Sequence, residues 1–566
     1  MTAGSQGDTG PGAAAPIRGE TEAPAFLLGF RRALYRGAGF SREEVRRPLI
    51  GVANSWGEIS PATKHLGVLT ARVKAGITAV GGTPVEFVLS GLCDGTCAAG
   101  PGVNRYNLPW RDIAVSYLEA VATANLFDGM VFVGVCDEVV PAHLLAALRL
   151  DLPALLVLGG SMVPGPSPGT WAGDMTAAYA ALQAGAVTEE QYLALEDTCC
   201  TGAGACGVMG TANTMQVFAE AAGLALPGSA VAPGGGTELE FIAYAAGGRA
   251  VELVREDLRP SAILTQGALE NGVRAVLAVG GSTCAVLHAQ ALAAEAGLAL
   301  ELDDFDRLSR STPLVADVLP SGRSSVYDYH RAGGVQGTLR SLAPLLDLEA
   351  RTVSGLTVGQ QASSARMDPE VIHSLDQPVQ AEGGMAVLRG TLAPGGAVFK
   401  QVGSTVRRFR GPARVFDSEE RAGDAILRGG VAAGDVIVVR GSGPIGAPGM
   451  PCLYGSVWLL KSMGLDDRVA LITDGRLSGT IRGLAIAHVS PESGLGGPLA
   501  AVRDGDEIAI DVDARTVDLL VPAGELSERV AALPSLSAAP KGALSHYRAL
   551  VGPTEKGAVL GTRTDN

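Results

Sequence analysis

The chain has 566 residues, 47% of them hydrophobic and 18% charged, and its formal net charge is −14. A chain this long exceeds one ordinary hydrophobic core and predicts about two to four domains. Its acidity excludes a broad basic surface for nucleic acid. No uncharged apolar stretch approaches the roughly 20 residues of a membrane span, so no membrane contact is expected.

The first residues, 1–24, are rich in Gly, Ala and Pro and are expected to form a disordered tail. They carry no charged-then-apolar signal pattern, which predicts a cytoplasmic protein. In a reducing compartment, the eight cysteines are expected to be free thiols or metal ligands rather than disulfides.

Short apolar runs alternate with helical patterns between about Arg47 and Gly160. The runs are PLIGVANSW, PVEFVLSG, GMVFVGVCD and PALLVLGG. This alternation predicts a parallel sheet with helices on both faces. Ligands of such sheets bind at the carboxyl ends of the strands, where NSW, CDG and VCDE are expected to lie together.

The sequence pattern changes in the later part of the chain. From Thr170 to about Leu346 the pattern is mostly helical, and after about residue 379 many short strands are separated by Gly, Pro and Asp turns. The predicted fold is α/β, with an N-terminal parallel-sheet α/β/α domain at 25–378. A C-terminal β-barrel domain is expected at 379–566.

Several cysteines are candidates for metal binding or thiolate chemistry. Cys136 follows a predicted strand, and Cys206 is expected to open a helix whose N-terminus would favour a thiolate. Other thiols lie beside Asp94 or in a glycine-rich loop: Cys93, Cys97 and Cys452. Taken singly, each is more typical of a small buried hydrophobe, and their spacing matches no zinc finger.

Carboxylates and a serine complete the candidates. Asp94 and Asp137 each follow a cysteine at a strand end, where paired carboxylates suit Mg²⁺; helix caps or turn residues are the alternative. Ser478 lies in TDGRLSGTIRG close to Arg476. On pattern alone it is a turn serine, because the GxSxG pattern is missing.

An ordered series of motifs resembles the dihydroxy-acid and sugar-acid (phosphogluconate) dehydratase family. It includes GVANSWGEISPATKHL, GVCDEVVPAHLLAALRLDLP, CTGAGACGVMGTANTM, GGSTCAVLHAQALA, GPIGAPGMP and ALITDGRLSG. The resemblance implies a hydro-lyase that removes water from a small 2,3-dihydroxy acid to give a 2-keto acid. It also implies an iron–sulfur cluster ([2Fe–2S] or [4Fe–4S]), Mg²⁺, and a homodimer or homotetramer.

The resemblance assigns roles residue by residue. Cys136 and Cys206 match two cluster cysteines, Asp94 and Asp137 match Mg²⁺ ligands, and Ser478 matches the base that removes the C2 proton. The chain departs from the family pattern at five positions, which are Ala62 for a cluster cysteine, Glu138 for a lysine that is carbamylated in some members, Cys452 for a glutamate, Cys284 for an asparagine and Cys93 for a serine.

These departures leave three hypotheses open. In the first, the chain is a dehydratase in which Cys97 or Cys93 replaces the missing cluster cysteine; Glu138 and Cys452 are then candidate metal ligands, while Arg476 and Cys284 are expected to bind substrate. In the second, the same fold performs different thiol or soft-metal chemistry, since a thiolate suits zinc better than Mg²⁺. In the third, the chain is a catalytically silent homologue.

Overall fold

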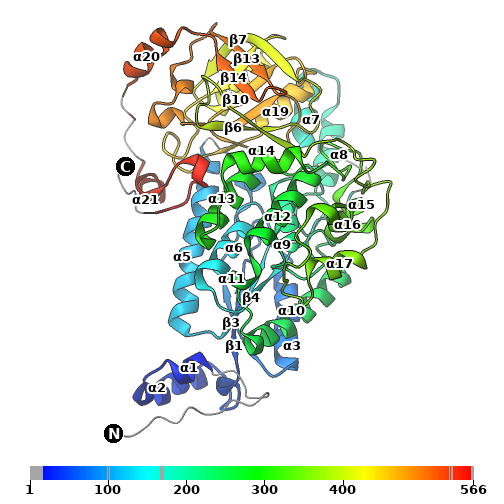
Figure 1. Cartoon of the computed structure of the whole chain (residues 1–566), viewed down its shortest axis with the longest axis vertical. Helices are drawn as coiled ribbons and strands as arrows, with labels where there is room; N and C mark the ends of the chain where they lie inside the picture. Colours follow the sequence, from blue (N-terminus) through cyan, green and yellow to red (C-terminus); the bar gives the residue numbers. More distant parts are fainter. Residues whose placement is uncertain are drawn as a thin grey trace.

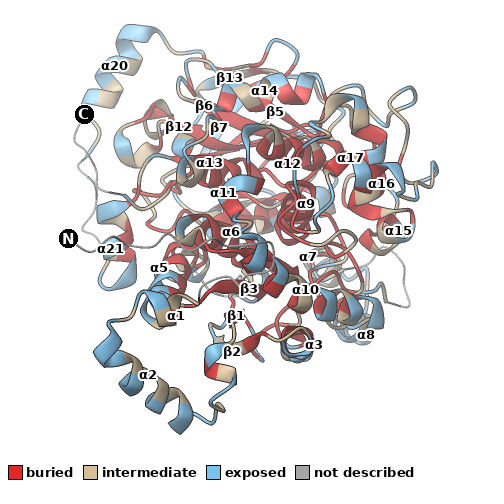
Figure 2. Cartoon of the chain, turned by 60° about the horizontal axis from the view of Figure 1, so that its bottom comes forward, coloured by how far each residue is buried: buried red, intermediate tan, exposed pale blue. Residues whose placement is uncertain are grey.

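The computed structural model describes residues 17–97, 100, 102–165, 171–534, 536 and 540–561 (Figure 1). Within the predicted tail, residues 1–16 lie outside the described residues, while Arg18–Thr21 form the short helix α1. Helix α2 (Ala25–Gly37) follows and has no buried residue. Figure 2 shows it projecting from the body of the molecule.

The N-terminal domain contains a four-stranded sheet in the order β2-β1-β3-β4. Its strands are β1 (Leu49–Asn54), β2 (Thr83–Val88), β3 (Gly129–Gly134) and β4 (Ala154–Leu158). All neighbours are parallel, which confirms the predicted parallel sheet. Asn54, the last residue of β1, is paired with Val88 of β2 and Val133 of β3. The loops that leave these three strands therefore start at the same edge.

Helices cover both faces of this sheet. Phe132 of β3 packs against the ring of His143 in α6 (Val139–Leu150). A side chain at Gly129 would instead meet Val254 of α10 (Thr237–Glu256). Odd and even positions of a strand face opposite sides, so α6 and α10 lie on opposite faces. Burial on both faces explains why β1, β3 and β4 are continuous apolar runs.

Two glycines allow α3 (Leu66–Ala79) to cross α10 at close range. A Cβ atom at Gly76 would lie 2.0 Å from the carbonyl oxygen of Tyr244, and one at Gly247 would lie 2.1 Å from that of Val73. Both distances are too short for any side chain. The crossing therefore requires backbone-to-backbone contact, and the helix layer depends on these glycines.

The C-terminal part contains an eight-stranded sheet in the order β14-β13-β7-β8-β10-β12-β6-β5. The strands are β5 (Met385–Leu388), β6 (Gly396–Lys400), β7 (Arg408–Phe416), β8 (Val436–Val439), β10 (Ala470–Thr473), β12 (Ala485–Ser490), β13 (Glu507–Asp511) and β14 (Thr516–Leu519). A backbone bridge between Arg389 and Thr516 links the two end strands. The sheet is thus nearly closed and barrel-like, as the strand-rich sequence predicts.

Alternate residues of this sheet enter two hydrophobic clusters. Val436 and Val438 of β8 belong to one cluster, and Ile437 and Val439 belong to the other. The second cluster lies against α18 (Glu419–Leu427) and α19 (Gly455–Ser462). Both faces of β8 are therefore buried, which accounts for the uninterrupted sequence VIVV.

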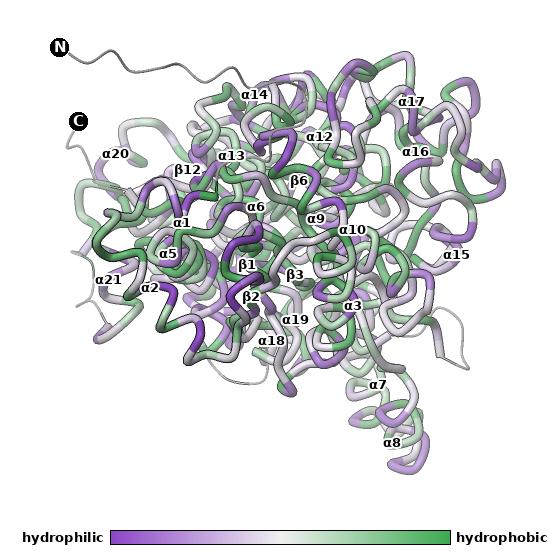
Figure 3. The backbone as a smooth tube through the Cα atoms, turned by 90° about the horizontal axis from the view of Figure 1, so that it is seen from below, coloured by the Kyte–Doolittle hydropathy of each residue, from purple (hydrophilic) through white to green (hydrophobic). Residues whose placement is uncertain are grey.

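The remaining α-helices surround these sheets, and α7 and α8 protrude in Figure 3. They are α4 (Asp94–Cys97), α5 (Asn107–Asn125), α7 (Asp174–Gln183), α8 (Glu189–Thr198), α9 (Thr211–Ala221), α11 (Pro260–Ile263), α12 (Gln266–Ala278), α13 (Cys284–Ala296), α14 (Leu302–Arg310), α15 (Val326–Arg331), α16 (Gly334–Leu342), α17 (Val358–Ser363), α20 (Ala523–Ala531) and α21 (Ala543–Leu550). No helix in the described part of the chain is long and apolar enough to span a membrane.

The C-terminal segment returns to the N-terminal domain. The buried Arg111 of α5 donates hydrogen bonds to the carbonyl oxygens of Gly557 and Ala558. Gly557 lies so close to α13 that a Cβ atom there would be 2.6 Å from the nitrogen of Ala291. The two domains are therefore joined at the chain end as well as at the linker.

The glycine crossing can be tested with a matched pair of substitutions in α3 and α10. Gly76→Ala should destabilise the protein by about 1–3 kcal/mol, because the new methyl group must displace a helix backbone. Gly248→Ala serves as the control, since its Cβ would lie 3.6 Å from Val80 in ordinary contact. Chemical denaturation would measure both, and equal effects would contradict the proposed role of Gly76.

Candidate active site

A cavity of about 290 Å³ lies at the carboxyl edge of the parallel sheet, where the C-terminal domain covers it. Loops from both domains contribute to its lining. Seven of its lining residues are candidate site residues or changed family positions that were named from the sequence. They are Ala62, Cys93, Asp94, Cys136, Asp137, Cys206 and Ser478. The structure therefore brings together residues that are up to several hundred positions apart in the sequence.

The thiols enter this cavity from three loops. Cys136 follows β3 in a backbone conformation with φ of 102°, which is strained for any residue with a side chain. Its Sγ donates to Oδ2 of Asp137 at 3.3 Å. Cys206 is exposed on the cavity wall. All eight cysteines are free thiols, as predicted.

The prediction that Cys206 opens a helix is wrong. Helix α9 begins only at Thr211, after Gly210 in an extended conformation. Cys206 lies in the preceding loop, where the side-chain amide of Asn213 donates to the carbonyl oxygens of Cys206 and Val208. The glycines that precede the helix allow this loop, and side-chain hydrogen bonds rather than a helix N-terminus hold the thiol in place.

Asp94 and Asp137 lie close enough for their charges to interact. Burial and the charge of Asp137 raise the pKa of Asp94 well above its usual range. Burial and the charge of Cys93 raise the pKa of Asp137 to about 7. Asn107 donates to Asp94 through its amide, while its own carbonyl oxygen is buried without a partner. Two crowded carboxylates of this kind have the chemistry to bind a hard cation.

Glu138 lies deeper, in a buried ion pair between the two domains. Its Oε1 accepts a hydrogen bond from Arg476, whose Nε donates to the carbonyl oxygen of Met450 at 2.8 Å. The other oxygen, Oε2, has no hydrogen-bond partner and lies 3.6 Å from Nε2 of His288. Burial opposes the charge of Arg476, but Glu138 and Asp94 raise the pKa of the guanidinium well above its usual value.

Cys284 and Cys452 form a second pair across the domain boundary. Both are buried, and their thiols are hydrogen-bonded to each other. Cys284 also interacts with the ring of His488 and donates from Sγ to the carbonyl oxygen of Leu477 at 3.4 Å. Neither thiol lines the 290 Å³ cavity. Two of the three family positions that changed to cysteine thus contact each other.

Ser478 lies in a turn that both domains hold. Its backbone N–H donates to Leu453, and the hydroxyl of Thr283 donates to the carbonyl oxygen of Leu477. The side chain of Ser478 is hydrogen-bonded to the Thr480 hydroxyl at 2.9 Å and accepts from the Thr480 N–H at 3.3 Å. Such a donor stabilises negative charge on the serine oxygen.

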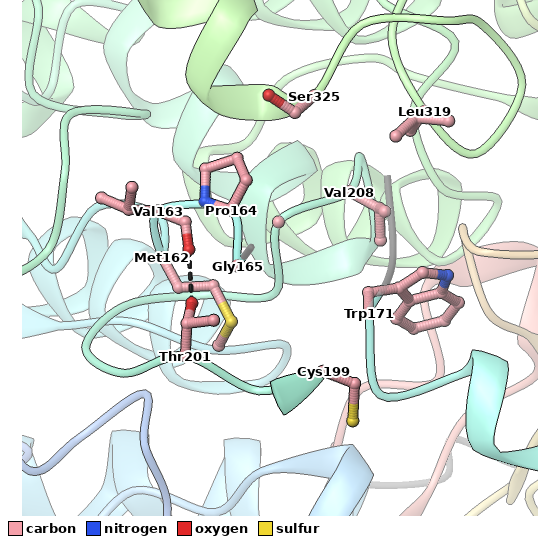
Figure 4. Close-up of a pocket in the computed structure, with 11 residues that line it drawn as sticks. Met162, Val163, Pro164, Gly165, Trp171, Cys199, Thr201, Val208, Leu319 and Ser325 are labelled. Carbon is pink, nitrogen blue, oxygen red and sulfur yellow. Dashed lines mark hydrogen bonds between the residues drawn. The ribbon is translucent and has the colours of Figure 1, made fainter. Parts of the chain in front are cut away.

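A smaller cavity of about 20 Å³ adjoins the first and shares Met162, Trp171, Cys199 and Val208 with it (Figure 4). Its wall is held by a hydrogen bond from the hydroxyl of Thr201 to the carbonyl oxygen of Val163 (Figure 4). These residues are mostly apolar, so they shape the approach to the thiols rather than add ligands.

Some of these contacts were not expected from the sequence pattern. Thr480 lies inside TDGRLSGTIRG, but no pattern singles it out, and Asn107 lies outside the quoted motifs. His488 adopts a positive φ of 57°. The HVSPESG motif was the one signal that could have drawn attention to His488. The others are identified only by the side chains that they contact.

Comparison with known proteins places the chain in a family. Residues 47–361 match the profile of the dihydroxy-acid/6-phosphogluconate dehydratase N-terminal domain, and residues 370–558 match its C-terminal domain. The chain belongs to the dihydroxy-acid/6-phosphogluconate dehydratase family. It is a hydro-lyase, as the relatives below also indicate, and the family resemblance inferred from the motifs is confirmed.

Relatives of this dehydratase are similar over nearly their whole length. A protein named dihydroxy-acid dehydratase from Caldicellulosiruptor bescii is 42% identical over 553 residues, covering 96% of this chain and 100% of the relative. One of the same name from Ignicoccus hospitalis is 44% identical over 539 residues, covering 94% and 97%. A third, from Pyrococcus abyssi, is 43% identical over 535 residues with the same coverage.

The Glu138–Arg476 pair in this dehydratase gives a first prediction for the site. Glu138→Gln should cost about 3–5 kcal/mol of stability, because it leaves a buried guanidinium without its counter-ion. Thermal denaturation would measure the loss. The matched control is Glu507→Gln, which removes an exposed partner of Arg410 and should change little. A Glu138→Gln variant as stable as the control would contradict the buried pair.

The Asp94–Asp137 pair gives a pH prediction for the metal-free dehydratase. The folded pKa of Asp137, about 7, exceeds the unfolded value of about 3.9, so its contribution to stability is full below about pH 4 and is lost as the pH rises towards 7. The melting temperature should therefore fall between about pH 4 and about pH 7. Added Mg²⁺ should restore it mainly at the higher pH, since ligand carboxylates must be deprotonated.

The control for this pH effect is Asp137→Asn in the same buffers. Glu419 and Glu492, whose pKa values burial also raises to about 7, remain in both proteins and contribute an equal slope. The difference between the two melting curves across pH therefore reports Asp137 together with its effect on Asp94. Parallel curves would show that this carboxyl does not carry the effect.

Proposed function

We propose that this dehydratase removes water from a small 2,3-dihydroxy acid to give a 2-keto acid, with Ser478 as the base. The observation that carries the proposal is the shared cavity, in which Ser478 faces the same space as Asp94, Asp137, Cys136 and Cys206. A serine positioned to lose a proton, two carboxylates and soft thiols are the groups that this reaction needs.

The donor chemistry fits both implied cofactors. Thiols from separate loops suit an iron–sulfur cluster of the [2Fe–2S] or [4Fe–4S] type. Asp94 and Asp137 suit Mg²⁺, which keeps several waters and needs only one or two protein carboxylates. When bound, the cluster supplies a Lewis acid for the leaving 3-hydroxyl, and Mg²⁺ supplies one for the carboxylate and 2-hydroxyl.

The described residues contain no group of three His, Cys, Asp or Glu side chains already arranged around one ion. A two-carboxylate Mg²⁺ site completed by substrate and water needs no such group. Of the predicted ligands, Glu138 is paired with Arg476 and Cys452 with Cys284. We therefore propose Asp94 and Asp137 as the Mg²⁺ ligands, with Glu138 as the counter-ion that holds Arg476.

The chain's own residues supply the proton transfer and the geometry. Ser478 takes the C2 proton, and the Thr480 N–H stabilises the charge that its oxygen carries. The C3–O bond breaks, the leaving hydroxyl receives the proton that Ser478 took from C2 and departs as water, and the resulting enol rearranges to the keto acid. The buried Lys400 donates to the carbonyl oxygen of Gly479 and so holds the turn that aims Ser478.

A second candidate function is soft-metal or thiol chemistry at Cys284 and Cys452. The direct contact between these thiols, with His488 beside Cys284, favours it. One zinc per chain that Cys452→Ser removes would support this alternative. Zinc-free protein that turns over a 2,3-dihydroxy acid would exclude it. The retained cavity residues argue against a silent homologue, because a chain without activity has no need to keep a base and two carboxylates together.

We also propose an oligomeric state and a cellular location for this dehydratase. Helix α2 exposes an apolar stripe at Phe26, Phe30 and Leu34, at a spacing of four residues. Such a stripe suits contact between copies of the chain, as in the predicted homodimer or homotetramer. The proposed partner of the site is a small hydroxy acid. Nucleic acid is not expected, and the proposed location is cytoplasmic.

Ser478→Ala tests the proposed base. With protein reconstituted anaerobically, formation of 2-keto acid from 2,3-dihydroxy-3-methylbutanoate should fall by about 10²–10⁴-fold, the usual contribution of a general base. Iron, sulfide and melting temperature should stay unchanged. Thr480→Val is the control, because it removes one hydrogen-bond partner but keeps the backbone donor, and its loss should be much smaller. Full activity of Ser478→Ala would overturn the assignment.

A further inference from the structure

Position 62 leaves the proposed cluster short of one ligand. Ala62 is buried and lines the cavity, but its methyl group cannot bind iron. Cys136 and Cys206, from the loops after β3 and before α9, are then the two thiols that match the family pattern. A cluster site with one open iron position needs a third protein thiolate.

Cys93 lies beside the position that Ala62 occupies. Strands β1 and β2 are parallel neighbours, so the chain after β1, which leads to Ala62, starts next to the chain after β2, which leads to Cys93. Ser60, which accepts a hydrogen bond from the N–H of Ala62 at 3.1 Å, also hydrogen-bonds to Cys93. One residue thus links both positions directly.

Cys93 also contacts a matched thiol. Its sulfur interacts with the thiol of Cys136, and both residues line the cavity with Cys206. Two ligands of one tetrahedral metal, with metal–sulfur bonds of about 2.3 Å, lie about 3.8 Å apart. Thiols that interact directly therefore need little movement to bind the same iron of a [2Fe–2S] cluster.

The surroundings of Cys93 suit a metal-bound thiolate. Besides Ser60, the backbone N–H groups of Gly95 and Thr96 hydrogen-bond to its sulfur at the start of α4. Hydrogen bonds of this kind orient a ligand and stabilise its charge. Cys97 is the last residue of the same helix and does not line the cavity, whereas Gly95 and Thr96 do. The geometry thus favours Cys93 over Cys97 as the replacement for the missing cluster ligand.

We infer that Cys93, together with Cys136 and Cys206, forms the thiolate set for an iron–sulfur cluster, and that Cys93 replaces the ligand that residue 62 provides elsewhere in the family. This inference rests on the proposed function. It assigns the third ligand to a different strand of the sheet, so the cluster is held by the loops after β2 and β3 and by the loop before α9.

The test is cluster retention in the full chain, reconstituted anaerobically with iron and sulfide. Iron and acid-labile sulfide counts, visible absorption and electron paramagnetic resonance of the reduced protein are the readouts. Cys93→Ser should weaken iron binding at least about 10-fold, since even outer-shell partners of metal sites contribute 10-fold or more. Cys97→Ser should match the wild type. Circular dichroism would confirm that each variant is folded.

A rescue variant separates ligand loss from misfolding. Adding Ala62→Cys to Cys93→Ser should restore iron, sulfide and the visible absorption, because residue 62 lines the same cavity. If Cys93→Ser misfolds, the single variant Ala62→Cys, challenged with a chelator, should hold its cluster despite alkylation of Cys93. Loss of the cluster in that protein would contradict the inference that Cys93 takes the place of a ligand at position 62.

The outcomes distinguish this inference from the function on which it rests. Wild-type protein that assembles no cluster would overturn both. A cluster that survives Cys93→Ser but is lost in Cys97→Ser or Cys200→Ser would overturn the inference alone, since Cys200 also lines the cavity. Loss in Cys93→Ser with rescue by Ala62→Cys would support it, whatever the substrate of the enzyme proves to be.

Discussion

The buried ion pair between Glu138 and Arg476 is the interaction on which the site depends. Glu138 follows β3 of the N-terminal domain, and Arg476 belongs to β11 (Arg476–Leu477) of the C-terminal part. Both side chains are almost completely buried. Neither charge is tolerable there alone, so the pair requires the two domains to remain in contact. Ser478 lies two residues after Arg476, and the pair therefore holds the proposed base over the strand ends.

Substitutions at the site follow one physical pattern. A carboxylate at position 138 is neutralised by Arg476, and the cysteines at 284 and 452 satisfy each other. These changes turn family ligand positions into internal contacts of the domain boundary. Asp94 and Asp137 line the cavity as the proposed hard donors, and Cys93, Cys136 and Cys206 line it as the proposed soft donors. In this proposal the site is rearranged into two groups of ligands with different chemistry.

Local strain marks the same region. Cys136 and His488 adopt positive φ angles, as does Met450, whose carbonyl oxygen accepts from Arg476. Such conformations cost about 1–3 kcal/mol each and persist only where surrounding contacts impose them. Here the contacts are the ion pair, the thiol pair and the held turn at Ser478. The strain is consistent with side chains that are positioned for chemistry at the expense of local stability.

The layered architecture and the composition of the site can be predicted from the amino-acid pattern. Apolar runs of strand length alternate with helical stretches, and both faces of each run must be buried, so a parallel sheet with its polar strand ends at one edge follows from pattern alone. That reasoning placed Cys136, Asp137 and Asp94 together correctly. The helix start at Cys206 was wrong, because the glycines before Thr211 favour a loop that only the contacts of Asn213 define.

Which of these residues become partners depends on how the chain packs in three dimensions. Sequence spacing could not separate Cys93 from Cys97, and only the folded chain shows that Cys93 lines the cavity whereas Cys97 does not. It could not show that Glu138 meets Arg476 338 positions later, or that Cys284 meets Cys452. Such pairs are set by how two separately folded layers pack, and packing depends on the whole surface of each domain rather than on any local motif.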